Sequence, residues 1–109
     1  MDSPSLYTAK SVLLKNGTSL DNYETSFGIR TIKYSKENGF ELNGKQVKFK
    51  GVCLHHDLGP LGSAINTSAL RFRMQLLKDM GCNAIRTSHN PPTPELLDLA
   101  DQMGFLIIN

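Results

Sequence analysis

The sequence predicts an α/β fold with a parallel sheet, preceded by a region of antiparallel strands. Beyond residue 50 the pattern alternates strand, helix, strand, helix and strand. The two helix ends also repeat, since "KDMG" precedes one strand and "DQMG" precedes the next. Repeated β-α units form parallel sheets, either an open doubly wound sheet or part of a (β/α)8 barrel. Three strands cannot close a barrel, so this part is expected to belong to a larger unit.

The first half of the chain has the pattern of antiparallel strands. "LYTAKSVLLK", residues 6–15, is expected to be one strand, "NGTSLDN" a turn or loop, and "YETSFGIRTIKY", residues 23–34, another strand. In "FELNGKQVKF" two short apolar-edged runs flank the pair Asn43-Gly44. Asn-Gly favours a type I′ turn because both central residues need positive φ, so a β-hairpin is predicted here.

The α/β part has three expected strands, "FKGVCL", "NAIRTS" and "FLIIN", and two expected helices. The first helix covers residues 67–80, with Gly81 at its C-terminal cap. In the second, Thr93 is the expected N-cap, Pro94 the first helical residue, and Gly104 the end. The apolar stripes expected on these helices are Ala69, Phe72, Leu76, Leu77 and Met80, and then Leu96, Leu99, Ala100 and Met103.

The composition is that of a globular chain, with 39% apolar and 20% charged residues. A net charge of +2, without a basic run interleaved with aromatics, gives no support for nucleic-acid binding. No apolar stretch approaches the roughly 20 residues that span a bilayer, and the N-terminus lacks the regions of a signal peptide. No dinucleotide, nucleotide or metalloprotease motif is present, so no cofactor is expected. Cys53 and Cys82 are expected to be buried free thiols.

Polar residues follow each of the three predicted parallel strands. His55, His56 and Asp57 follow the first, residues 86–90 belong to the second, and Asn109 ends the third. In parallel α/β folds the carboxyl ends of the strands form the functional edge. We therefore expect these groups to lie at one edge of the sheet.

Several chemistries remain open for these residues. Adjacent His55 and His56 point to opposite faces, which disfavours a metal site of the His-x-His kind, but a zinc or iron site from His55, Asp57 and His89 is an alternative. Arg86 could pair with a structural carboxylate, or hold an anionic catalytic group by bidentate hydrogen bonds.

A pair of catalytic carboxylates is missing from the predicted edge. Retaining glycosidases need two, about 5–5.5 Å apart. The glutamates of the chain are Glu24, Glu37, Glu41 and Glu95. None of them follows a predicted parallel strand, so the chain by itself is expected to bind a ligand without turning it over.

The segment "NAIRTSHNPPTPELLDLADQMGFLII" resembles the first signature of glycoside hydrolase family 2, and "FKGVCLHHDLGPLG" resembles the family's first barrel strand and loop. His55 falls on the histidine of that loop. Cys53 and Leu54 stand where the family usually has Asn and Arg or Lys, and Asn90 where it commonly has tyrosine. The resemblance covers residues 40–109, with a weaker fit of residues 4–36 to an immunoglobulin-like sandwich.

This resemblance implies the start of a (β/α)8 barrel at residues 39–109, preceded by strands of an immunoglobulin-like sandwich at residues 1–38. It implies retaining hydrolysis of β-glycosides, most commonly β-galactosides, with β-glucuronides and β-mannosides as relatives. The family's acid/base and nucleophile glutamates would lie beyond Asn109. His55, His89 and Asn90 are then expected to bind substrate, and Arg86 to orient the nucleophile.

The expected partners are a β-glycoside or oligosaccharide and the remainder of a barrel, or self-association through an open sheet edge. A non-catalytic carbohydrate-binding remnant, a metal-dependent barrel hydrolase and a chain without function are the alternatives.

Overall fold

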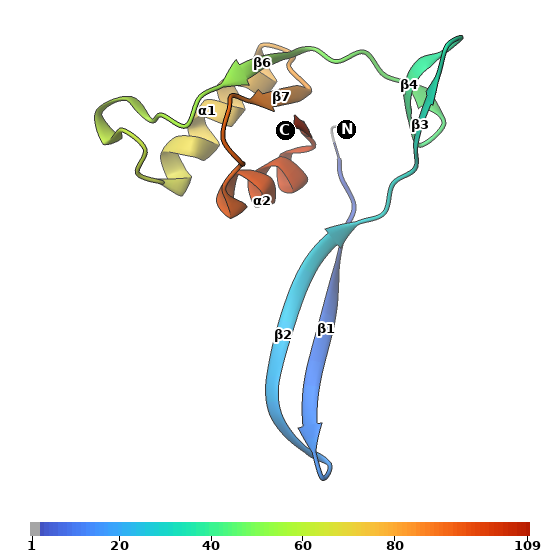
Figure 1. Cartoon of the computed structure of the whole chain (residues 1–109), viewed down its shortest axis with the longest axis vertical. Coiled ribbons are helices and arrows are strands. Elements are labelled where there is room, and N and C mark those ends of the chain that lie inside the picture. The colour runs from blue at the N-terminus through green and yellow to red at the C-terminus, as the bar shows by residue number, and fades with distance from the viewer. Residues whose placement is uncertain (1–2) are drawn as a thin grey trace.

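The computed structural model describes residues 3–109 and contains three separate groups of strands (Figure 1). β1 pairs with β2 in an antiparallel ribbon, β3, β4 and β5 form an antiparallel sheet, and β6, β7 and β8 form a parallel sheet. The elements are β1 (Leu6–Lys15), β2 (Thr18–Gly28), β3 (Ile32–Ser35), β4 (Gly39–Leu42), β5 (Lys45–Gln46), β6 (Gly51–Leu54), the 3₁₀ turn Gly59–Leu61, α1 (Thr67–Asp79), β7 (Ala84–Thr87), α2 (Pro94–Met103) and β8 (Leu106–Ile108). The predicted α/β class with β-α-β-α-β parallel units is confirmed.

The ribbon of β1 and β2 extends away from the rest of the chain (Figure 1). The prediction of a turn or loop over "NGTSLDN" was wrong beyond its first two residues, because β2 already begins at Thr18. Asn16 and Gly17 alone make the turn, with φ of 51° and 80°. Two residues with positive φ suit the tight turns that join adjacent antiparallel strands. The expected strand over residues 23–34 is also interrupted, since the chain leaves β2 at Gly28 and enters another sheet at Ile32.

The hairpin predicted at Asn43-Gly44 is present between β4 and β5, with φ of 51° and 74° at these two residues. Phe40 of β4 is buried, and its ring lies 4.7 Å from that of Phe49. It packs in a small cluster with Ala84 and Leu106, the first residues of β7 and β8. The hairpin therefore covers the amino ends of the parallel strands and leaves their carboxyl ends free.

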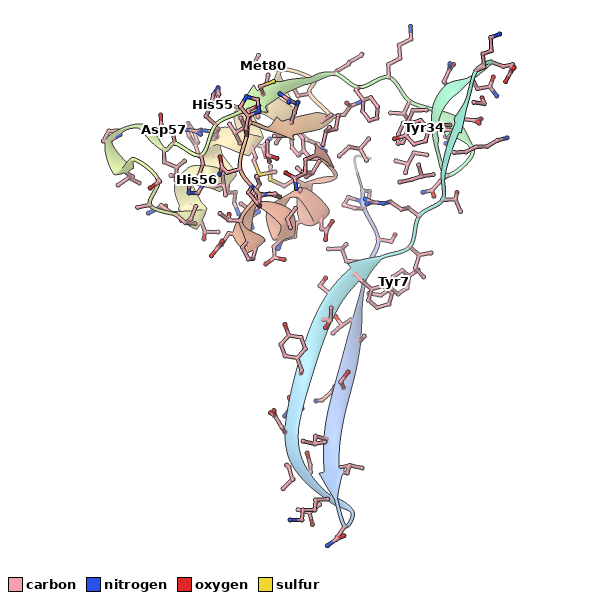
Figure 2. All side chains as sticks on the ribbon, in the orientation of Figure 1. Tyr7, Tyr34, His55, His56, Asp57 and Met80 are labelled. Atoms are coloured by element: carbon pink, nitrogen blue, oxygen red, sulfur yellow. The ribbon has the colours of Figure 1, made fainter. Side chains whose placement is uncertain are left out.

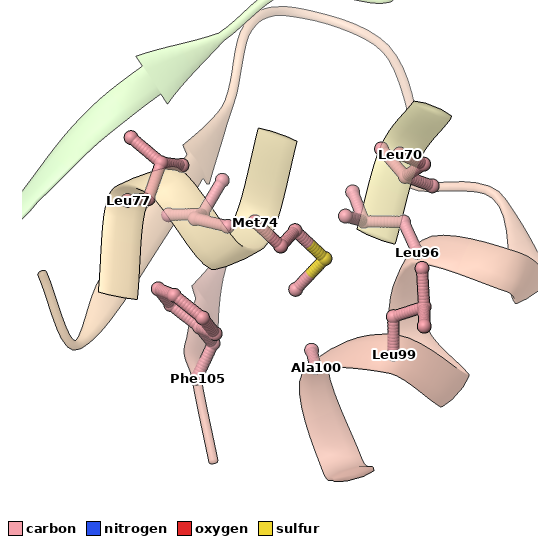
Figure 3. Close-up of a cluster of buried hydrophobic side chains, with 8 residues drawn as sticks. Leu70, Met74, Leu77, Leu96, Leu99, Ala100 and Phe105 are labelled. Carbon is pink, nitrogen blue, oxygen red and sulfur yellow. The ribbon is translucent and has the colours of Figure 1, made fainter. Parts of the chain in front are cut away.

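The main core lies between the parallel sheet and the two helices (Figure 3). Met74 of α1, Ile85 of β7 and Leu99 of α2 are its most deeply buried large side chains. The other buried members of this cluster are Leu70, Leu77, Leu96, Ala100 and Phe105. Burial of this apolar surface fixes the helices on one face of the sheet. Neither helix in residues 3–109 is long and apolar enough to cross a membrane.

The apolar stripe predicted for α1 was largely wrong. Leu70, Met74 and Leu77 face the core, whereas Phe72 and Met80 are 67% and 73% exposed. The helix carries apolar residues on more than one side, so the 3.6-residue period fits two stripes equally well. Only the packing against the sheet selects one of them.

The helix ends follow the predicted chemistry. The Thr93 hydroxyl accepts a hydrogen bond from the Leu96 amide at 3.4 Å, Pro94 is the first helical residue, and Gly104 ends α2 with φ of 74°. Gly81 likewise follows α1 with φ of 84°. These caps fix the points at which the chain turns back into β7 and β8.

Candidate functional site

The carboxyl ends of the parallel strands meet at one edge of the sheet. Cys53 of β6 is in register with Arg86 of β7, and Arg86 is in register with Ile108 of β8. The segments that follow these strands therefore start side by side. Figure 2 shows His55, His56 and Asp57 along the segment that follows β6.

Alternation along the strands assigns side chains to two faces. Val52, Leu54 and Ile85 pack into the core on the helix side. Cys53 and Arg86 must then point to the opposite face, because successive side chains of a strand alternate. Both are exposed there. This open face is the one that would line the axis of a complete barrel.

Arg86 makes its contacts on the open face. Its Nη1 donates to the Ser88 hydroxyl at 3.2 Å and contacts the Cys53 sulfur at 3.9 Å. Within residues 3–109 no carboxylate lies within ion-pair distance of this guanidinium. The alternative of a structural ion pair therefore has no support in the described part of the chain.

Cys53 is free, as predicted, but it is exposed and not buried, because its face of the sheet is uncovered. Hydrogen bonds with Ser88 and then with Arg86 lower the pKa of its thiol below the ordinary value of 9.0. Cys82 is also free and half-buried against the core.

The residues predicted to bind substrate are open to a ligand. His55, His89 and Asn90 are exposed. In the part of the chain that the structure describes, neither imidazole has a hydrogen-bond partner. An imidazole can donate or accept a hydrogen bond with a sugar hydroxyl.

The structure brings only part of the predicted set into one pocket. His55 and Asn90 line a hollow between the two loops, together with His56, Asp57 and Arg73. Arg86 and His89 lie outside its lining. Among residues 3–109 no three His, Cys, Asp or Glu side chains are grouped so that they could hold a metal ion, so the metal site from His55, Asp57 and His89 is not formed.

Three side-chain contacts at the strands were missed from the sequence. Thr87 donates to the Asn109 amide oxygen at 2.9 Å and so ties the ends of β7 and β8. The Asn83 amide accepts from the Lys50 backbone N–H at 2.8 Å and donates to the Lys48 carbonyl at 2.9 Å. The third is the contact of Arg86 with Cys53 and Ser88. Only strand register could have revealed these contacts, since each of the three includes a pair of residues more than 20 positions apart.

The glutamates lie away from this edge. Glu24 is on the β1–β2 ribbon, 3.5 Å from Lys10, and Glu41 is in β4. Glu37 is in the turn before β4, and Glu95 is in the first turn of α2. Residues 3–109 therefore place no glutamate at the carboxyl ends of the parallel strands.

Parallel β-α units with polar groups at the carboxyl ends of the strands are the arrangement of (β/α)8-barrel enzymes. Residues 33–109 match the TIM barrel domain of glycosyl hydrolases family 2. The chain belongs to this family, and it includes the start of the barrel.

Its relatives act on different sugars. The chain is 53% identical over 109 residues to the β-galactosidase BoGH2A of Bacteroides ovatus, covering all of this chain and 13% of that enzyme. It is 43% identical over 105 residues to a β-glucuronidase of Streptococcus agalactiae, covering 95% of this chain and 17% of that enzyme. The crystal structure of a β-glycosidase from Bacteroides vulgatus superimposes with a TM-score of 0.91 at 45% identity, over 95% of this chain and 14% of that one. The chain thus spans between about one eighth and one sixth of these relatives.

Proposed function

We propose that this chain is the segment of a retaining β-glycosidase, most closely a β-galactosidase, in which an immunoglobulin-like sandwich leads into the catalytic barrel. The observation that carries the proposal is the 53% identity to a β-galactosidase over the whole chain, including the polar edge. The matched stretch includes the part of the chain that contains Arg86 and His89.

In this function the edge residues serve a double displacement at the anomeric carbon. One carboxylate attacks that carbon and forms a glycosyl-enzyme, while the other protonates the departing oxygen and then activates water. Both carboxylates would come from barrel strands outside residues 1–109. Arg86 would hold the nucleophile in its ionised form by bidentate hydrogen bonds.

His55, His89 and Asn90 would bind hydroxyls of the sugar whose bond is cleaved. Their side chains are exposed and have no hydrogen-bond partner among residues 3–109, which supports this role. A hydrogen bond to a sugar hydroxyl that strengthens in the oxocarbenium-like transition state lowers the barrier and not only KM.

The proposed domain boundary lies at residues 38 and 39. The packing of Phe40 against Ala84 and Leu106 supports a boundary before β4, and the pairing of β3 with β4 crosses that boundary. The β1–β2 ribbon, by contrast, is exposed along both strands.

A β-glucuronidase or β-mannosidase of the same family is the second candidate, favoured for glucuronides by the relative in Streptococcus agalactiae. Reading the source gene past codon 109 and expressing its whole product decides between them. We expect hydrolysis of 4-nitrophenyl β-galactoside in preference to the corresponding glucuronide and mannoside. A preference for the glucuronide would favour the second candidate, and binding of galactose without turnover would favour a carbohydrate-binding remnant.

Site variants test the assigned roles in the same product. His89→Ala and Arg86→Ala should lower kcat by about 10²-fold or more, the usual cost of removing one group that stabilises the transition state. Arg71→Ala is the control for loss of an arginine, because Arg71 lies on α1 and its Nη2 donates to Gln102 at 2.8 Å. The 109-residue chain alone should show no turnover, and turnover that disappears with His89→Ala would contradict this expectation.

A further inference from the structure

The Arg86 side chain is long and exposed, yet it is held at a single nitrogen. Nη1 carries two hydrogens, and two acceptors lie next to it, the Ser88 hydroxyl at 3.2 Å and the Cys53 sulfur at 3.9 Å. Both hydrogens of Nη1 are therefore engaged. Within residues 3–109 the hydrogens of Nε and Nη2 have no acceptor, and these two nitrogens form one edge of the guanidinium that can bind a carboxylate through two parallel hydrogen bonds.

Both acceptors are fixed by the sheet. Ser88 is 5% exposed, and its backbone N–H donates to the Leu54 carbonyl at 3.0 Å, which ties it to the end of β6. Cys53 is the register partner of Arg86 on the neighbouring strand. The two contacts thus reach Arg86 from its own strand and from the next one, so they restrict rotation of the side chain in two directions.

We propose that Cys53 and Ser88 are positioning residues for Arg86, holding its guanidinium through Nη1 so that the edge formed by Nε and Nη2 faces the site. The proposal rests on the proposed function for the nature of the carboxylate that this edge binds. The two contacts that fix Nη1 lie within the 109 residues. The sulfur of Cys53 is a weak acceptor for the guanidinium. The lowered pKa of the thiol agrees with a sulfur that accepts hydrogen bonds from its neighbours.

The restriction of the Arg86 guanidinium can be measured in the 109-residue chain by ¹⁵N NMR of the arginine side chains, which reports its rate of rotation. The rate of rotation of the Arg86 guanidinium should rise roughly 2- to 10-fold in Cys53→Ala and in Ser88→Ala, as expected for the loss of one hydrogen bond. Cys53→Asn should restore the slow rate because an amide oxygen is also an acceptor. Arg71, whose Nη2 donates to Gln102 at 2.8 Å, is the internal control and should not change.

Cys53 is exposed, so Cys53→Ala removes no buried packing. The variant therefore tests the contact with Arg86 without unfolding the chain. An unchanged Arg86 rotation rate in Cys53→Ala and Ser88→Ala would overturn the proposal. Cys82→Ala is the matched control for removal of a thiol and should leave Arg86 unaffected.

Kinetic measurements on the whole gene product distinguish a role in positioning Arg86 from a role in stability alone. Cys53→Ala and Ser88→Ala should lower kcat with little change in KM, and Cys53→Asn should recover kcat. Full activity of Cys53→Ala and Ser88→Ala would overturn the positioning role. A wild-type product that hydrolyses no aryl β-glycoside would contradict the proposed function, while the NMR rates would still decide whether Arg86 is held.

Discussion

Gly51 opens β6 at a point where the next strand leaves no room for a side chain. A Cβ built on this residue would lie 2.1 Å from the Ala84 carbonyl oxygen and 2.7 Å from its carbon. Both atoms belong to the backbone and cannot rotate away. Gly51→Ala must therefore push β6 and β7 apart at this end.

The cost of Gly51→Ala follows from the bonds that hold the two strands there. The Lys50 carbonyl accepts two hydrogen bonds, from the backbone N–H of Asn83 at 2.7 Å and from the backbone N–H of Ala84 at 3.2 Å. Losing two such bonds costs about 1–3 kcal/mol in total, and crowding in a packed region adds about 1–3 kcal/mol. We expect a loss of about 2–6 kcal/mol, a large share of the roughly 5–15 kcal/mol that stabilises a domain.

Hydrogen exchange measures this loss locally. In Gly51→Ala the amides of Asn83 and Ala84 should exchange at least about 30-fold faster, the rate change that corresponds to about 2 kcal/mol. Gly28→Ala is the matched control, because among residues 3–109 the atoms nearest to its Cβ would be 3.8 Å away. Equal protection of Asn83 in both variants would refute the steric argument.

Three further outcomes are expected. Met74→Ala should lower the free energy of unfolding in urea by about 2–5 kcal/mol. Phe72→Ala, at an exposed position, should change it by no more than about 0.5 kcal/mol. Similar losses in the two variants would show that α1 faces the sheet with its other apolar stripe. Thr93→Ala should cost about 1 kcal/mol because one amide in the first turn of α2 loses its acceptor, while Thr93→Ser should cost little, and equal midpoints would argue against the cap. Because the pKa of the Cys53 thiol is lowered in the folded chain, folding favours the thiolate; this contribution to stability is present above pH 9.0 and is lost as the pH falls through the folded pKa. Iodoacetamide should accordingly alkylate Cys53 at lower pH in the folded chain than in guanidinium chloride, and coincident profiles would contradict the shift.

Local backbone chemistry made the turns and caps predictable from the sequence. Positive φ occurs at Asn43, Gly44 and Gly104, and glycine and asparagine are among the few residues that tolerate it, so their presence predicts these turns. Thr93 caps α2 because its hydroxyl accepts a hydrogen bond from a backbone N–H in the first turn. Such signals depend on a few neighbouring residues. They hold whatever the rest of the chain does.

The errors arose where tertiary packing decides between equal local patterns. Residues 18–22, all polar except Leu20, were assigned to a turn or loop, but they belong to a strand whose side chains are all exposed. An exposed strand needs no apolar alternation, so nothing in its composition distinguishes it from a loop. The same ambiguity affected α1, whose second apolar stripe is uncovered in residues 3–109.

The candidate site was predictable as an edge but not as a set of contacts. The order strand, helix, strand requires the carboxyl ends of the strands to lie together, and this alone gathers His55 and Arg86 at one side. Whether Arg86 meets a carboxylate, a hydroxyl or a sulfur depends on the register of β6 against β7. The sequence does not specify this register, because Cys53 and Arg86 are 33 positions apart. Register is fixed instead at the other end of the strands, where Asn83 binds the backbone before β6. The position of the Cys53 sulfur beside Arg86 is therefore set by a contact at the opposite end of the same strand pair, and a substitution at Asn83 should disturb Arg86 without touching it.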